Sequence, residues 1–311
     1  MANLTDQQII QQFTEDCKIR DLSNHTIENY ASCLNLYTKY LKQHGYTIFT
    51  VDREILRELI ADLRKKGIHH KTIENRFSAY SSLYDYAVYE QLITQNIIPG
   101  LRKRYLQRYK NEIIHHRKLI SVEQMAQFIH SILDTRDKAI CLLFAKTGIR
   151  RRELGALDLD DINWENMSII LKPTHKRSNR TVFFDNETAF TLKQWLVKRE
   201  HLADNKNNAL FTSYTNRNSR FKRNGIGTIF TKWATISGLH KPDSKKLEDH
   251  FTPHCCRHWF TTHLRRNGMP REYVEELRGD KRNGAMDIYY PIDSEDLRKN
   301  YLSFIPQLGI I

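Results

Sequence analysis

The sequence TGIRRREL at residues 147–154 ends an apolar helical stretch, residues 139–146, with a glycine and then starts a new turn with three arginines. Residues one and two apart on a helix point in different directions, so these arginines cannot share one face. Arg150 stands beside the glycine corner, and Glu153 is placed three positions on to orient it. The same pattern would fit an ordinary solvated, basic helix start, so other motifs must decide between the two interpretations.

A second motif, TPHCCR at residues 252–257, has the form of a helix start. Thr252 is a suitable N-cap, and Pro253 suits the first helical position. His254 and Arg257 then lie three apart on one face of the first turn, where backbone N–H groups favour an anion. The H-x-x-R pattern recurs at residues 263–266, inside the same predicted helix and without a cap.

A third motif combines LRGD at residues 277–280 with IYY at residues 288–290. The glycine ends a predicted helix, Asp280 follows it, and Tyr289 lies nine residues beyond Asp280. The chain has 15 tyrosines, and a single tyrosine more often packs than reacts. Only the combination of Tyr289 with the arginine and histidine motifs makes it a candidate.

The charge of the chain indicates a polyanionic partner. The 311 residues include 49 Lys and Arg against 36 Asp and Glu, a formal charge of +13. Two stretches concentrate the excess, residues 101–118 and residues 213–224, and both interleave basic with aromatic side chains as nucleic-acid-binding segments do. The predicted DNA-binding residues are Arg102, Lys103, Arg104, Arg108, Lys110, Arg217, Arg220, Lys222 and Arg223.

The hydrophobic pattern predicts a mainly α-helical chain with a small β-sheet, α+β at most. Ile27, Tyr30, Leu34, Tyr37 and Leu41 form an apolar stripe at helical spacing. We expect a helical N-terminal domain over residues 1–100, a basic linker over 101–118, and a larger domain over 119–311 with a C-terminal tail helix. Residues 167–185 are expected to form a β-hairpin.

Several classes of protein are disfavoured. No apolar run approaches the roughly 20 residues of a membrane span, and no basic-then-apolar leader starts the chain. The five cysteines are odd in number and form no C-x-x-C pair, which predicts a reducing, cytoplasmic environment. Neither a dinucleotide-binding nor an ATP-binding glycine motif is present, so no cofactor is expected.

Two metal-dependent alternatives compete with this interpretation. His254, Cys255, Cys256, His258 and His263 could suggest zinc, but adjacent cysteines fit known zinc spacings poorly. A metal-dependent nuclease could use Asp158, Asp160 and Asp161, although these alternate with leucines as a polar edge would. We therefore expect no metal.

Taken in order, T-G-I-R-x-x-E-L, H-x-x-R, L-x-G-D and I-Y resemble the tyrosine recombinase or phage integrase family, including Xer-type and archaeal integrases. The resemblance covers residue 119 to the end, and the helical first domain looks like that family's SAM-like core-binding domain. It implies a site-specific recombinase whose Tyr289 attacks a DNA phosphodiester and forms a 3′-phosphotyrosine. Tyr289 is preferred over Tyr290 because it directly follows Ile288, whereas Tyr290 precedes Pro291.

The resemblance also implies roles for other residues. His254 would be the general base or a hydrogen-bond partner of the tyrosine, and Arg150 and Arg257 would bind the non-bridging oxygens. A lysine in the hairpin turn would protonate the leaving 5′ oxygen; Lys176 fits best, with Lys172 as the fallback. Asp280 stands where the family usually has a second histidine, and its proposed role is to orient Arg150, Arg257 or Tyr289.

The partners implied are double-stranded DNA carrying a specific site and further copies of the chain, four protomers acting on two sites. The C-terminal tail would dock on a neighbouring protomer. Integration or excision of a mobile element is the favoured role, with a Xer-like dimer resolvase or a non-catalytic DNA-binding protein as alternatives.

Overall fold

The computed structural model describes residues 4–107, 118–173, 180–202, 207–216, 219–244, 246–280 and 292–310. The chain divides into two compact units, Met1–Ile113 and Ile114–Ile311. No helix in these described ranges is long and apolar enough to span a membrane.

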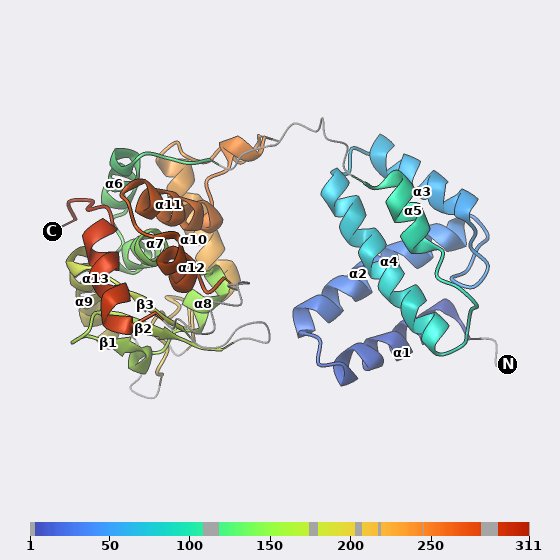
Figure 1. The fold of residues 1–311 in the computed structure, drawn as a ribbon, viewed down its shortest axis with the longest axis horizontal. Coiled ribbons are helices and arrows are strands. Elements are labelled where there is room, and N and C mark those ends of the chain that lie inside the picture. Colours follow the sequence, from blue (N-terminus) through green and yellow to red (C-terminus); the bar gives the residue numbers. More distant parts are fainter. Residues whose placement is uncertain are drawn as a thin grey trace. The chain divides into compact units, whose positions relative to one another are not determined.

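The first unit consists of helices around one apolar core (Figure 1). The helices are α1 (Asp6–Ile19), α2 (Asn24–Gln43), α3 (Arg53–Lys65), α4 (His70–Tyr89) and α5 (Ile98–Tyr105). Ser23 and Asp52 cap α2 and α3 by accepting backbone N–H groups with their side chains. The predicted stripe on α2 faces the core, where the Tyr37 hydroxyl hydrogen-bonds that of Tyr84 at 3.0 Å.

The predicted linker begins later than residue 101, because residues up to Tyr105 belong to α5. Pro99 lies in the first turn of this helix, where a backbone N–H has no partner within the helix. The proline is therefore compatible with a helix start. Ile98 and Leu101 are buried in the core of the first unit. Basic residues on α5 are therefore presented by an ordered helix.

The second unit is mainly helical with one small sheet, which confirms the predicted fold class. Its helices are α6 (Val122–His130), α7 (Thr135–Thr147), α8 (Arg151–Ala156), α9 (Asn186–Glu200), α10 (Arg223–Ile236), α11 (Pro253–Arg266), α12 (Arg271–Arg278) and α13 (Ser294–Phe304), with short 3₁₀ turns η1 (Leu159–Asp161) and η2 (Leu247–Asp249). Helix α7 is buried along nearly its whole length and packs against α6, α9, α10 and α11. Because α7 is fixed on all these sides, the residues at its C-terminal end are held in place.

The sheet has three antiparallel strands in the order β1 (Ile162–Asn163), β2 (Ser168–Leu171) and β3 (Arg180–Phe183). The predicted hairpin over residues 167–185 is confirmed, with Ser168 opposite Phe183 and Leu171 opposite Arg180. Strand β1 was not predicted because two residues are too few to show an alternating pattern.

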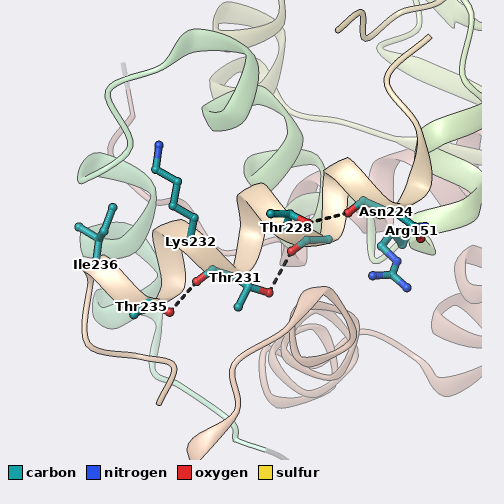
Figure 2. Close-up of a pocket in the computed structure, with 8 residues that line it drawn as sticks. Arg151, Asn224, Thr228, Thr231, Lys232, Thr235 and Ile236 are labelled. Carbon is teal, nitrogen blue, oxygen red and sulfur yellow. Dashed lines mark hydrogen bonds between the residues drawn. The ribbon is translucent and has the colours of Figure 1, made fainter. Parts of the chain in front are cut away.

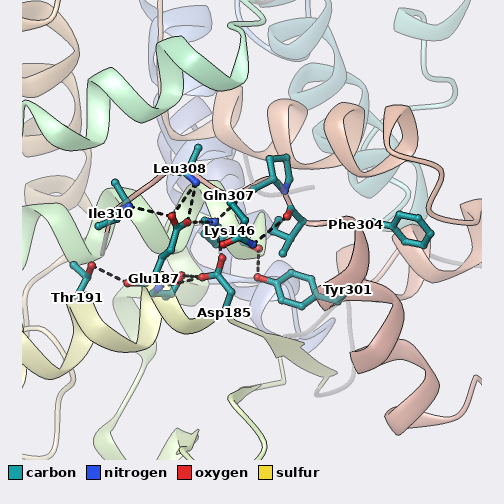
Figure 3. A network of polar contacts seen from close by, with 12 residues as sticks. Lys146, Asp185, Glu187, Thr191, Tyr301, Phe304, Gln307, Leu308 and Ile310 are labelled. Carbon is teal, nitrogen blue, oxygen red and sulfur yellow. Dashed lines mark hydrogen bonds and ion pairs between the residues drawn. The ribbon is translucent and has the colours of Figure 1, made fainter.

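A buried ion cluster joins the end of α7 to the C-terminal tail (Figure 3). The Lys146 side chain is 0% exposed, and its Nζ donates to Asp185 Oδ2 and Glu187 Oε2, each at 2.5 Å, and to the Pro306 carbonyl at 2.7 Å. Glu187 also accepts from the backbone N–H groups of Leu308 and Ile310. The hydrogen bonds and charge of Lys146, with those N–H groups, outweigh the effect of burial and lower the pKa of Glu187. The tail is thus fastened to its own unit.

We expect Lys146→Met to lower the free energy of unfolding by about 3–5 kcal/mol, because two buried carboxylates lose their counter-ion. Urea unfolding at neutral pH measures this loss. Lys193→Met, on the exposed face of α9, is the matched control and should change stability by no more than about 0.5 kcal/mol. Equal stability of the two variants would contradict the assignment of the cluster as a charged, paired network.

Candidate active site

The glycine corner of the first motif places Arg150 at a helix start. Helix α7 ends at Gly148 in the left-handed conformation, with φ of +60°, and a Cβ there would lie 2.5 Å from Cδ1 of Phe260. Only glycine fits both the conformation and the space. Arg150 follows in extended conformation as the N-cap residue of α8.

Glu153 holds Arg150 as the sequence predicts. Its carboxylate accepts the Arg150 backbone N–H at 2.7 Å and the Arg150 Nη1 at 3.2 Å. Glu153 is nearly buried, which by itself would raise its pKa. The hydrogen bonds and charge of Arg180, followed by those of Arg150, outweigh burial and lower the pKa of this carboxyl. Glu153 is therefore an ionised anchor.

Arg257 lies at the start of the second turn of α11 and connects two motifs. Its Nη1 donates to the Gly148 carbonyl and its Nη2 to the Arg278 carbonyl, each at 2.7 Å. The side chain is 6% exposed. Burial, followed by the charges of Arg150 and Arg278, lowers the pKa of Arg257 to about 9. A site that crowds positive charge in this way favours a bound anion.

Asp280 brings the arginines of three motifs together. It follows Gly279, which ends α12 in the left-handed conformation with φ of +60°. Its Oδ1 lies 3.5 Å from Arg257 Nη2 and 3.8 Å from Arg150 Nη2, and its Oδ2 lies 2.8 Å from Arg278 Nε. These contacts place a carboxylate beside the two arginines that are predicted to bind phosphate.

Arg180, at the start of β3, is a further member of this cluster that the sequence did not reveal. It donates to both Glu153 oxygens, at 2.8 and 3.0 Å, and from Nε to the Leu277 carbonyl at 3.1 Å. Strand alternation could have found it, because Arg180 lies two residues before the buried Val182 and so faces the same side. Its position beside the hairpin turn is equally typical of a solvated residue.

His254 lies on the exposed side of the first turn of α11, one turn before Arg257. Its ring packs edge-on against His258, with centroids 5.1 Å apart. The second H-x-x-R pattern is structural, because His263 is buried and its Nε2 lies 3.2 Å from the Ile120 carbonyl. The two H-x-x-R patterns therefore differ, because His254 is exposed and His263 is buried.

Of the two candidate lysines and the candidate nucleophile, Lys172 alone lies within the described residues. Lys172 is bound to Asp158, and its Nζ lies 3.5 Å from Asp161 Oδ2. Lys176, Tyr289 and Tyr290 lie outside the described residues. The ion pairs of Lys172 make it the weaker candidate for a proton donor.

The residues named for the two metal-dependent alternatives have other contacts in the structure. Asp158 is bound by Lys172 and Arg220, and Asp160 accepts from Asn208 at 2.7 Å. Cys255 and Cys256 are buried in the core. Within the described part of the chain, no three His, Cys, Asp or Glu side chains gather as metal ligands would.

The predicted DNA-binding residues divide into three groups. Lys103 and Arg104 on α5 are exposed, as are Lys222 and Arg223 at the start of α10, whereas Arg102 is half-buried. Arg220 differs from the expectation, because its guanidinium binds Asp158 and the carbonyls of Gly155 and Leu157 within its own unit. Arg108, Lys110 and Arg217 lie outside the described residues.

A groove of about 750 Å³ runs along α10 (Figure 2). Arg151 lies against the helix at Gly227, where a Cβ would approach its Nη1 to 2.2 Å. Three threonines on this face donate to carbonyls one turn back, at 2.8–3.1 Å. The lining residues are Arg151, Asn224, Gly227, Thr228, Thr231, Lys232, Thr235 and Ile236. Apart from Gly227 and Ile236, these residues have polar or basic side chains, and none of them is a carboxylate.

Comparison with known proteins gives two family matches. The model of the phage integrase family matches residues 119–295, and that of the phage integrase N-terminal SAM-like domain matches residues 10–91. Among curated proteins, the tyrosine recombinase XerC of Vibrio cholerae serotype O1 is 27% identical over 288 residues, which cover 91% of this chain and 87% of that protein. The XerC of Actinobacillus succinogenes is 26% identical over 301 residues, 95% of this chain and 96% of that protein.

Solved structures share the fold. The Tn1549 transposon integrase in complex with transposon right end DNA matches with a TM-score of 0.68 at 17% identity, covering 94% of this chain and 97% of that one. The lambda integrase dimer bound to a COC′ core site matches with a TM-score of 0.68 at 15% identity, covering 94% of this chain and 100% of that one.

Proposed function

The chain belongs to the phage integrase family, and on this basis we propose that it is a tyrosine recombinase that cleaves and rejoins DNA at specific sites. The observation that carries the proposal is the cluster in which Arg150 and Arg257 approach one carboxylate of Asp280. A phosphate is the natural competitor for such a site, because a guanidinium fork matches phosphate and carboxylate geometry alike.

The proposed reaction is a transesterification. The Tyr289 oxygen attacks phosphorus, its proton passes to His254, and the bond to the 5′ oxygen breaks while Lys176 supplies a proton to that oxygen. A phenol with a pKa of about 10 needs such a base near neutral pH. Arg150 and Arg257 stabilise the charge that grows on the non-bridging oxygens. A 5′-hydroxyl then reverses the step and rejoins the strand.

Asp280 is proposed to orient the two arginines before DNA arrives. As an ionised carboxylate it accepts hydrogen bonds and cannot donate one to the phosphate. It therefore differs in chemistry from the histidine usual at this position. The ion pair with Arg278, at 2.8 Å, holds Asp280 beside the site. Its distances to Arg257 and Arg150 are longer, at 3.5 and 3.8 Å.

The groove along α10 and its basic start are proposed to contact DNA. Replacing Lys222 and Arg223 together with glutamine should reduce the slope of log affinity against log salt by about 2, since each phosphate contact contributes about 0.9. Fluorescence anisotropy with a duplex at several salt concentrations measures this slope. Lys193→Gln on α9 is the control, and an equal loss of slope there would contradict the assignment of this surface.

The proposed biological role is integration or excision of a mobile element by a tetramer, with each C-terminal tail bound to its own unit through Lys146 and Glu187. Resolution of chromosome or plasmid dimers is a second candidate, favoured by the XerC relatives that align over most of the chain. Sequencing the DNA attached to the protein in cells distinguishes them. Element ends would indicate integration, and one recurring site on a replicon would indicate resolution.

The enzymatic proposal is tested by trapping. The protein is incubated with candidate attachment-site DNA nicked near the cleavage point, with a chelator present, and run on a denaturing gel. We expect a covalent adduct that persists in chelator, because the proposed charges come from side chains. Tight DNA binding with no adduct would instead support a non-catalytic DNA-binding protein.

A further inference from the structure

Arg180 links parts of the active site that are far apart in sequence. Its side chain is 8% exposed and lies between Glu153 of the first motif and the end of α12. It donates two hydrogen bonds to Glu153, at 2.8 and 3.0 Å, and one to the Leu277 carbonyl at 3.1 Å. Its Cδ is so close to Gly279 that a Cβ there would approach it to 2.7 Å. Such packing fixes the guanidinium in one orientation.

Glu153 is shared between two arginines. A carboxylate has about four acceptor positions. Arg180 occupies two of them, and the backbone N–H and Nη1 of Arg150 fill the others at 2.7 and 3.2 Å. Arg180 makes the shorter, two-pronged side-chain contact, so it is the main counter-ion of Glu153.

The alternative partner for Glu153 would be Arg150. A nearly buried carboxylate without a counter-ion is costly, and it would draw the remaining guanidinium into a two-pronged pair. Arg150 is 35% exposed at its side chain, whereas Arg180 is 8% exposed. Arg150 can turn toward DNA only if Arg180 remains as the counter-ion of Glu153.

Resting on the proposed function, we infer that Arg180 is a positioning residue that neutralises Glu153 and so prevents it from withdrawing Arg150 from the scissile phosphate. Arg180 itself does not touch the DNA in this mechanism. In the sequence, Arg180 is the first residue of the strand that follows the hairpin turn. Its charge is opposite to that of Glu153, with which it forms an ion pair.

The test is a double-mutant cycle on the rate of adduct formation with nicked DNA. Arg180→Met should slow the reaction by about 10²-fold, the cost typical of losing a preorganised electrostatic group. Glu153→Gln combined with Arg180→Met should return the rate to within about twofold of Glu153→Gln alone, because no carboxylate is left to capture Arg150. DNA affinity should be unchanged throughout.

Controls separate positioning from folding. Arg199→Met removes another buried arginine, one on α9 that donates to the Ala209 carbonyl. It should lower the melting temperature, and adding Glu153→Gln to it should not raise the rate of adduct formation. If Arg180→Met does not fold, the same cycle is run with Arg180→Gln, which also removes the charge but keeps a polar side chain of similar reach to donate a hydrogen bond. A double variant as slow as its Arg180 parent, or a single variant as fast as wild type, overturns the inference. Absence of an adduct with the wild-type protein would instead refute the proposed function.

Discussion

Replacing Tyr289 with phenylalanine is expected to abolish covalent attachment to nicked DNA while leaving DNA binding intact. The change removes one oxygen, the atom that attacks phosphorus in the proposed reaction, and keeps the ring. Removing a nucleophile outright typically costs about 10⁶-fold in rate, so no adduct should be detected. Adduct formation is read from a denaturing gel, and binding from anisotropy with the same duplex.

Tyr290→Phe is the matched control, since it removes the same atom from the neighbouring residue. Its adduct yield should equal that of the wild-type protein. Loss of the adduct in Tyr290→Phe and its survival in Tyr289→Phe would exchange the roles of the two tyrosines and contradict the spacing from Ile288 on which the assignment rests.

Replacing Arg257 with lysine is expected to reduce the cleavage rate by about 10²–10³-fold, the range found when a preorganised electrostatic donor is lost. The guanidinium spans two carbonyls, of Gly148 and Arg278, and a single ammonium cannot bridge both while facing a phosphate. Single-turnover cleavage of nicked DNA measures the effect. The loss should fall on the chemical step, with DNA affinity changed little.

Arg266→Lys provides the control, since this exposed arginine ends the second H-x-x-R pattern on the same helix. A similar loss in Arg266→Lys would contradict the distinction drawn between the two patterns.

The local parts of the site could be predicted from sequence. The glycine corner at Gly148 and the helix start at Thr252 depend on neighbouring residues, and both occur where the pattern placed them. The orienting contact of Glu153 with Arg150 spans three residues and was equally visible. Short-range geometry fixes such features, so one sequence suffices to find them.

The partners that lie far apart in sequence could not be predicted. Arg180 meets Glu153 from 27 residues away, and Lys146 meets Glu187 from 41 residues away. Nothing in the local pattern distinguishes a buried lysine or arginine from a solvated one, since the packing of other elements decides it. Arg220 shows the opposite kind of error. It was predicted to bind DNA because it lies in a basic stretch, but its guanidinium binds Asp158.

The proposed phosphotyrosine mechanism is tested by identifying the linked atoms in the trapped adduct. The adduct is digested with nuclease and protease and the peptides are sequenced by mass spectrometry. We expect a nucleotide joined through its 3′ phosphate to Tyr289, and a free 5′-hydroxyl on the released strand. A linkage through a 5′ phosphate, attachment to another residue, or cleaved DNA without any linked peptide would contradict it.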